Sequence, residues 1–244
     1  MPSSDDINNL KSNSLLIGIL NPYENKSEFS NLNKNKISSC CMELIPRISR
    51  AQSMDVLSSQ ANLAGYRSVI DAAEQFGKAF PMMMTAAGRV NPAKVMILGV
   101  GVAGLQAIAT AKRLGAVVSA TDVRAATKEQ VESLGGKFIM VEDDEAQNAE
   151  TAGGYAKEMS EDYKKKQAQL IAETVSKQDI VICTALIPGK KAPVLITEEM
   201  VSSMIPGSVV IDLAVEAGGN CPLSKMNEIV AVSYTHLRAH ETLL

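Results

Sequence analysis

Residues 94–115 carry the most informative pattern of the chain: KVMILGVGVAGLQAIATAKRLG. An apolar, β-branched run breaks at Gly99, Gly101 and Gly104 and then continues with helical periodicity. This pattern predicts a strand, a tight glycine turn and the first turns of a helix. We expect Gly99 to permit the turn, Gly101 to let a pyrophosphate approach the backbone, and Gly104 to let the helix lie close to the strand.

An aspartate follows the glycine turn at the distance expected for a dinucleotide site. The second apolar run, VVSATD, covers residues 117–122, so that Asp122 comes eighteen residues after Gly104. A carboxylate there can accept hydrogen bonds from both hydroxyls of an adenosine ribose. Glycines recur at this spacing by chance, and a buried strand followed by a surface aspartate looks similar in sequence. Here, however, a strand, a glycine turn, a helix and a second strand that ends in an acid follow one another in the order that a dinucleotide site requires. The sequence therefore predicts a dinucleotide site.

Strand and helix patterns continue to alternate after Asp122. A capping box of Thr127 and Gln130 predicts a short helix, a polar helix is expected over residues 160–176, and Thr197 begins another. This alternation predicts an α/β fold with a Rossmann-type, doubly wound parallel sheet. Ligands of such sheets lie at the carboxyl ends of the strands. Those ends are expected at residues 99–104, 122–124, 184–186 and 212–216.

The chain before residue 82 is less regular. Residues 1–13 are expected to be a disordered lead, followed by strands over residues 14–20 and 36–45 with a weak helix between them. These elements cannot bury a core of their own, so residues 1–56 are expected to be the C-terminal remnant of a first α/β domain. Residues 57–81 are expected to form a linking helix, which ends at Phe80 before Pro81. Methionines 82–84 are expected to fill gaps in a core, within a Rossmann domain over residues 82–231.

Two loops leave alternatives open. Residues 46–59 carry donors and acceptors of every type, but their spacing favours a solvated loop entering a helix capped by Ser53 or Asp55. The acidic residues 142–150 are followed by a Gly-Gly-Tyr sequence that ends at Tyr155. A loop of this length is either a lid over the site or a charged surface loop.

Composition excludes several classes of function. The net charge is −3 with no basic cluster, so nothing indicates a nucleic acid partner. The longest apolar stretch, residues 95–111, is interrupted by glycines and is shorter than the ~20 residues of a membrane span. The four cysteines show no Cys-x-x-Cys spacing, which indicates reduced thiols and no metal site. Residues 232–244 break the pattern and are expected to be a non-native tail.

Five segments together resemble the NAD(H)-binding domain, domain I of the α subunit, of proton-translocating NAD(P) transhydrogenases. The segments are PRISRAQSMD (46–55), GVGVAGL (99–105), AGGYA (152–156), TALIPG (184–189) and AGGNC (217–221). The resemblance runs from about residue 44 to about residue 223 and is more specific than the glycine turn alone. It places the chain in the alanine dehydrogenase/transhydrogenase superfamily.

The resemblance implies roles for individual residues. Arg47, Gln52, Asp55 and Ser58 would hold the nicotinamide carboxamide and aim the ring, which makes them the candidate catalytic residues and reverses the preference for a solvated loop. No metal is implied. The candidate cofactor-binding residues are these four and Ile48, Ser49, Arg50, Gly99, Gly101, Val102, Gly104, Asp122, Val123, Arg124, Gly154, Tyr155, Gln167, Thr184, Ala185 and Leu186.

The implied activity is hydride transfer from NADH, held by this chain, to NADP⁺, held by a partner domain. In the resembled proteins this transfer is coupled to proton translocation through a membrane domain. The partners implied are the NADP(H)-binding domain, the membrane domain and a second copy of this chain, at the cytoplasmic face of the bacterial inner membrane or the matrix side of the mitochondrial one. An alanine dehydrogenase, which shares the architecture, and a non-enzymatic NAD-binding module are the alternatives.

Overall fold

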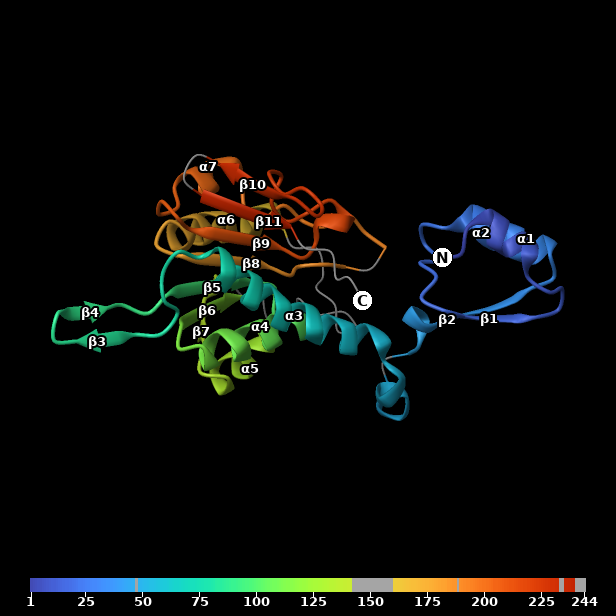
Figure 1. Ribbon diagram of the computed structural model, residues 1–244, viewed down its shortest axis with the longest axis horizontal. Helices are drawn as coiled ribbons and strands as arrows, with labels where there is room; N and C mark the ends of the chain where they lie inside the picture. Colours follow the sequence, from blue (N-terminus) through green and yellow to red (C-terminus); the bar gives the residue numbers. More distant parts are fainter. Residues whose placement is uncertain (47, 142–159, 188, 233–234, 240–244) are drawn as a thin grey trace. The chain divides into compact units, whose positions relative to one another are not determined.

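The computed structural model describes residues 1–46, 48–141, 160–187 and 189–232, and the backbone of residues 235–239. The chain separates into two compact units, Met1–Gln60 and Ala61–Leu244 (Figure 1). In the described part of the chain, no helix has both the length and the apolar character needed to cross a membrane.

The first unit is a small α/β arrangement around two parallel strands. Leu15 of β1 lies opposite Ser38 of β2. The helices cover the sheet through a small core of Ile7, Leu32 and Ile37, so the expectation that these elements cannot bury a core of their own is wrong. The elements are α1 (Ser4–Asn9), β1 (Leu15–Gly18), α2 (Lys26–Lys34), β2 (Ser38–Cys41) and the 3-10 helices η1 (Met42–Leu44) and η2 (Ser49–Met54).

The expectation of a disordered lead over residues 1–13 is wrong. The Ser3 hydroxyl accepts a hydrogen bond from the Asp6 backbone N–H at 3.2 Å, and the Asp6 carboxylate accepts one from the Ser3 N–H at 3.0 Å. This reciprocal cap starts α1, and the helix buries Ile7 completely. The cap and the burial of Ile7 are local features that the polar overall composition of the segment does not reveal.

The second unit is built on a seven-stranded sheet in the order β10-β11-β9-β8-β5-β6-β7. The strands from β9 to β7 in this order run parallel, which confirms the predicted doubly wound parallel sheet. In the region predicted to be a non-native tail, β11 lies parallel to β9 and antiparallel to β10. The elements are α3 (Val56–Gln75), β3 (Met83–Thr85), β4 (Gly88–Val90), β5 (Lys94–Leu98), α4 (Val102–Arg113), β6 (Val117–Thr121), α5 (Thr127–Ser133), β7 (Lys137–Phe138), α6 (Glu161–Val175), β8 (Ile180–Cys183), α7 (Glu198–Ser202), β9 (Val209–Asp212), the 3-10 helix η4 (Val215–Ala217), β10 (Ile229–Val232) and β11 (Thr235–Ala239).

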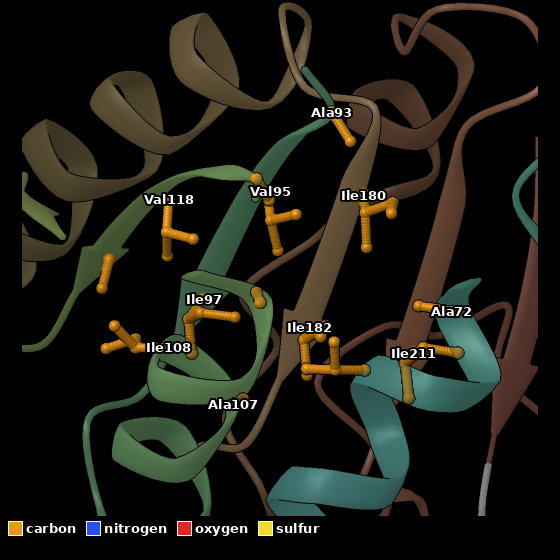
Figure 2. Close-up of a cluster of buried hydrophobic side chains, with 14 of the residues drawn as sticks. Ala72, Ala93, Val95, Ile97, Ala107, Ile108, Val118, Ile180, Ile182 and Ile211 are labelled. Carbon is orange, nitrogen blue, oxygen red and sulfur yellow. The ribbon is translucent and has the colours of Figure 1, made fainter. Parts of the chain in front are cut away.

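Helices cover both faces of the sheet, so the unit has three layers and two cores. Val95 and Ile97 of β5 point to the core under α3, α4 and α5, as Figure 2 shows for α3 and α4. Met96 and Leu98 point to the opposite core, under α6 and α7. Because both faces of the parallel strands are buried, the strands read as continuous apolar runs in the sequence.

The predicted linking helix ends five residues early. α3 runs to Gln75, whereas residues 76–80 are not helical. Phe76 and Phe80 are still buried and meet edge to face, with ring centroids 6.1 Å apart. Gly77, which disfavours the helix, lies between them. The four-residue spacing therefore correctly indicated two buried aromatic residues that contact each other, but it wrongly predicted a helix between them.

The expectation that methionines 82–84 fill a core is also wrong. β3 and β4 form a two-stranded antiparallel hairpin that projects from the second unit (Figure 1). Met82, Met83 and Met84 are 55, 50 and 70% exposed, and Val90 on the facing strand is 48% exposed. An isolated two-stranded hairpin is marginally stable in water, and this one presents apolar side chains to solvent.

The predicted capping box at the start of α5 does not form. Ala126 occupies the N-cap position without a side-chain cap, and Thr127 is the first residue of the helix. The Thr127 hydroxyl donates backwards to the Arg124 carbonyl at 2.8 Å, because Thr127 is buried against the preceding turn. The next two helices begin where they were predicted to begin, and there the Ser160 and Thr197 side chains accept hydrogen bonds from first-turn N–H groups.

Candidate functional site

The carboxyl ends of four adjacent strands meet at one edge of the second unit's sheet. β9, β8, β5 and β6 are neighbours in the sheet and run in the same direction. Their last residues lead into the segments that begin at Leu213, Thr184, Gly99 and Asp122. This edge is where a doubly wound sheet binds its ligands, and it holds the predicted residues of the glycine turn and of the segments after β6 and β8.

The glycine turn has the expected geometry. Gly99 has a positive φ of 97°, and a Cβ on Gly104 would lie 2.0 Å from the Gly99 carbonyl oxygen, so α4 packs directly on the turn. Gly101 is the N-cap of α4 and makes no side-chain cap. A Cβ on Gly101 would meet no protein atom within 4 Å, so the space in front of Gly101 is open. An anion placed there would face the N-terminus of α4, which starts at Val102.

Asp122 is engaged by the protein itself. Its Oδ2 accepts from the Val100 N–H at 2.7 Å and from Arg124 Nη2 at 2.8 Å, while Oδ1 accepts from the Arg124 N–H and Nε, both at 2.9 Å. These bonds use the four acceptor positions of the carboxylate. A ribose diol therefore reaches Asp122 only by replacing the side-chain bonds of Arg124. Val123, the residue between Asp122 and Arg124 in the sequence, packs against the buried Tyr163.

The segment after β8 lies against the glycine turn. The Thr184 hydroxyl donates to the Gly99 carbonyl at 2.8 Å. A Cβ on Gly99 would come within 2.9 Å of the Ala185 nitrogen, so the two backbones are in direct contact. Leu186, the next residue, is 47% exposed. Thr184, Ala185 and Leu186 therefore share one edge with the glycine turn, as predicted from the strand ends.

The polar loop belongs to the first unit, where it forms η2 and the start of α3, a helix that continues past Gln60 into the second unit. Asp55 caps α3, because its Oδ1 accepts from the Ser58 N–H at 2.9 Å and its Oδ2 accepts from the Ser58 hydroxyl at 2.7 Å. Gln52 is exposed, and its carbonyl accepts from the Asp55 N–H. Ile48, Ser49 and Arg50 are exposed as well. Arg47 lies outside the described residues.

Of the three remaining predicted residues, one lies within a helix and not at a strand end, and two lie outside the described residues. Gln167 lies in the middle of α6 and is partly buried. Gly154 and Tyr155, with the whole predicted lid, lie outside the described residues. Among the residues that the structure describes, no group of three or more His, Cys, Asp or Glu side chains could hold a metal ion.

Two buried polar residues at this edge were not predicted as site residues. Asp212, at the end of β9, is fully buried and accepts hydrogen bonds from the N–H groups of Ala214, Asn220 and Cys221 at 2.9 to 3.0 Å. Asn220 is also fully buried. The sequence signal was present, because an acid ends a predicted strand and a Gly-Gly-Asn sequence follows it.

Burial dominates the electrostatics behind this edge. Desolvation raises the pKa of Asp212 above its ordinary value, although its hydrogen bonds to backbone N–H groups oppose the shift. Desolvation also raises the pKa of Cys183 well above its ordinary value, and the neighbouring Asp212 carboxylate adds to the effect. The Cys183 thiol is therefore protonated at neutral pH and is a packing group rather than a nucleophile.

Known families match both units of the chain. Residues 68–238 match the family described as "Alanine dehydrogenase/PNT, C-terminal domain", and residues 1–64 match "Alanine dehydrogenase/PNT, N-terminal domain". The chain is 66% identical over 227 residues to an NAD(P) transhydrogenase α-subunit polypeptide of Rhodospirillum rubrum. That match covers 93% of this chain and 59% of the relative, so the chain spans little more than half the relative's length.

More distant relatives and solved structures agree. An alanine dehydrogenase of Bacillus subtilis is 32% identical over 178 residues, which cover 70% of this chain and 40% of that protein. A crystal structure of a transhydrogenase from Sinorhizobium meliloti superposes with a TM-score of 0.89 at 54% identity, covering 99% of this chain and 65% of that one. The family matches extend over nearly the whole sequence, and the resemblance to transhydrogenase α subunits is confirmed: the chain belongs to the alanine dehydrogenase/PNT family.

Proposed function

We propose that this chain is the NAD(H)-binding component of a proton-translocating NAD(P) transhydrogenase and that it presents NADH for hydride transfer to NADP⁺ on a partner domain. Its relatives support transhydrogenation over alanine oxidation, because the identity is 66% to a transhydrogenase subunit and 32% to an alanine dehydrogenase. Coupling to proton movement then belongs to a membrane domain that would associate with this chain at the membrane face.

The open glycine turn carries the nucleotide portion of the proposal. A pyrophosphate needs close approach to backbone N–H groups at a helix N-terminus. Gly101 leaves that approach open, and Gly104 brings α4 onto the strand end. The residues present thus fit a dinucleotide, with Gly99 to Gly104 under the phosphates and Thr184, Ala185 and Leu186 beside them.

Asp122 supports NAD(H) as the nucleotide held by this chain. A carboxylate that faces the adenosine ribose accepts from a free diol and repels a 2′-phosphate. Arg124, which now bonds both oxygens of that carboxylate, would turn outward when the ribose takes its place. NADP(H) would accordingly be held by the partner domain.

The proposed task of the polar loop is orientation. Bound nicotinamide supplies the carbon that gives or takes the hydride, so no acid or base of the protein is needed in that step. Gln52, Asp55, Ser58 and Arg47 would hold the carboxamide and fix the direction in which the ring faces the partner. The Asp55 cap on α3 supports this role, because it ties the loop to a rigid helix.

A second copy of the chain also belongs to the proposal. The β3–β4 hairpin exposes three consecutive methionines and Val90, and such a patch favours contact with another protein surface. We assign this hairpin to the homodimer contact.

A mixing experiment separates the proposal from its alternatives. The chain, lengthened to the full length of its relatives, would be given NADH, an NADP⁺ analogue with a distinct absorbance, and increasing amounts of an NADP(H)-binding partner domain. Transhydrogenation requires that reduction of the analogue depends on the partner and saturates with it. Reduction of NAD⁺ by alanine without the partner would instead establish an alanine dehydrogenase, and NADH binding without either reaction would leave a binding module.

A further inference from the structure

Asn220 is a buried carboxamide at the carboxyl edge of the sheet, outside the candidate cofactor-binding residues. We infer that Asn220 is a positioning residue, which fixes Ala185 and Leu186 for the bound nucleotide. The inference rests on the proposed function, because it assigns Asn220 a task in the nucleotide site proposed there.

The Asn220 side chain binds the segment after β8 at three points. Its Oδ1 accepts from the Ala185 N–H at 3.1 Å, and its Nδ2 donates to the Ala185 carbonyl at 2.9 Å and to the Pro193 carbonyl at 2.7 Å. One carboxamide thus engages both backbone polar groups of Ala185, as a neighbouring strand would. Because the Ala185 N–H already donates to Asn220, Ala185 contributes to nucleotide binding through its position and not through a hydrogen bond from its N–H group.

Asn220 is itself held on two sides. Its N–H donates to Asp212 Oδ2 at 2.9 Å, and its carbonyl accepts from the N–H groups of Leu195 and Ile196 at 2.9 and 3.0 Å. Gly219, with a φ of 76°, makes the first bond possible, because a Cβ there would lie 2.9 Å from Asp212 Oδ2. The three side-chain bonds of Asn220 to Ala185 and Pro193 form what we call the Asn220 clamp. The clamp is anchored to the end of β9, so it cannot follow a displaced Ala185.

The clamp determines where Leu186 points. Leu186 is 47% exposed, so packing in a core does not orient it. On its N-terminal side, Thr184 is tied to the Gly99 carbonyl, and Ala185 is tied to Asn220. These two ties fix the backbone that carries Leu186 relative to the glycine turn. Loss of the Asn220 carboxamide would release Leu186 although it leaves Leu186 chemically unchanged.

The test is a double-mutant cycle on NADH affinity, measured by NADH fluorescence on folded protein. Asn220→Leu removes the three bonds at similar side-chain volume, and we expect it to weaken NADH binding about tenfold. Leu186→Ala should also weaken binding. If Asn220 acts through Leu186, the double variant should bind within about twofold of Asn220→Leu alone, because the second change removes a contact that is already lost.

Gln178→Leu is the matched control. Gln178 is also a buried amide, 8% exposed, and its Nε2 donates to the Thr174 carbonyl at 3.2 Å. It lies before β8, at the opposite end of the strand from Thr184. Its loss should lower the free energy of unfolding without changing the NADH dissociation constant. If Asn220→Leu is not recovered folded, Asn220→Ser replaces it in the cycle.

Three outcomes would overturn the inference, and they are distinguishable. Unchanged NADH affinity in the Asn220 variant would remove the positioning role and leave the proposed function intact. Additive effects of the Asn220 and Leu186 substitutions on NADH affinity would show that Asn220 acts independently of Leu186. Absence of NADH binding by the unmodified chain would overturn the proposed function and the role of Asn220 with it.

Discussion

Asp122 performs a structural task and, we propose, a recognition task with the same carboxylate. It ties Val100 and Arg124 together across the ends of β5 and β6. We expect Asp122→Ala to weaken NADH binding about tenfold or more, since hydrogen bonds to a charged group are lost. NADPH binding should weaken less or improve, because the repulsion disappears and Arg124 becomes available to a 2′-phosphate.

Parallel titrations with NADH and NADPH measure this gap between the two affinities. Asp179→Ala is the control, because Asp179 also binds a strand N–H, that of Lys94 at 2.9 Å, but at the amino end of β5. An unchanged gap in Asp122→Ala would contradict the assignment of Asp122 to the ribose.

Asp212 should make stability depend on pH in a direction opposite to that of most acids. Burial raises its pKa above the ordinary 3.8, so between that value and the folded-state pKa the folded chain holds a proton that the unfolded chain has released. The contribution of Asp212 to stability is therefore greatest below this window and decreases as the pH rises through it.

Urea unfolding of the unmodified chain and of Asp212→Asn, followed from about pH 4 to about pH 7, measures this contribution. The asparagine does not titrate, so the stability advantage of the unmodified chain should shrink with rising pH. The variant should still be less stable by about 1–3 kcal/mol, because its amide group cannot accept from all three backbone N–H groups. An advantage that grows with pH would contradict the assigned direction.

The η2 loop and its junction with α3 should affect hydride transfer more than NADH affinity. Asp55→Asn preserves a good helix cap, and Gln52→Asn keeps the amide but shortens its reach. A misplacement of about 1 Å can lower a rate about a hundredfold, whereas one exposed hydrogen bond contributes only about 1 kcal/mol to binding. We therefore expect a large loss in single-turnover transfer to NADP⁺ on the partner domain and little change in the NADH dissociation constant.

Both quantities would be measured on the lengthened chain. Equal losses of affinity and transfer would make the loop an ordinary binding element. If neither quantity changes, the loop is solvated, and Asp55 serves only as the cap of α3 that the structure describes.

The elements show why some predictions from sequence succeed. The parallel strands and the glycine turn follow from local signals, namely apolar runs with a fixed period and glycines that permit the turn. Phe76 and Phe80 are four residues apart, which predicted a helix, but they lie beyond the end of α3 and contact each other through their rings. Methionines 82–84 are equally apolar in a core and on an exposed hairpin, so their composition cannot distinguish the two.

The Asn220 clamp could not be predicted because it depends on distance in space. Asn220 and Ala185 are 35 residues apart in the chain. No period or spacing in the sequence connects them, and only the adjacency of β8 and β9 brings their loops together. Asp122 and Arg124 are only two residues apart, but their nearness in the sequence does not show that the Arg124 side chain folds back onto the carboxylate.

We propose that the β3–β4 hairpin is the surface through which the chain forms a dimer. We expect Met82→Ser combined with Met84→Ser to shift the chain from dimer to monomer, because the exposed apolar area of the hairpin is reduced. Sedimentation velocity over a range of concentrations measures the shift. Val117→Thr is the control. Val117 is another exposed apolar residue of the same unit but lies outside the hairpin, so this substitution should leave association unchanged. A variant hairpin that still forms the dimer would place the contact elsewhere.

Gly101→Ala tests whether the carboxyl edge of the second unit binds NAD(H) through the glycine turn. Gly101 has an ordinary negative φ of −83°, and the new Cβ would meet no protein atom within 4 Å, so the fold accepts it. The free energy of unfolding should change by no more than about 1 kcal/mol, the usual cost of an alanine at an N-cap. The same methyl group would stand where the pyrophosphate approaches the backbone. Titration of the folded variant should therefore give an NADH dissociation constant at least about tenfold larger than that of the unmodified chain, whereas an unchanged affinity would show that the nucleotide does not bind at the glycine turn.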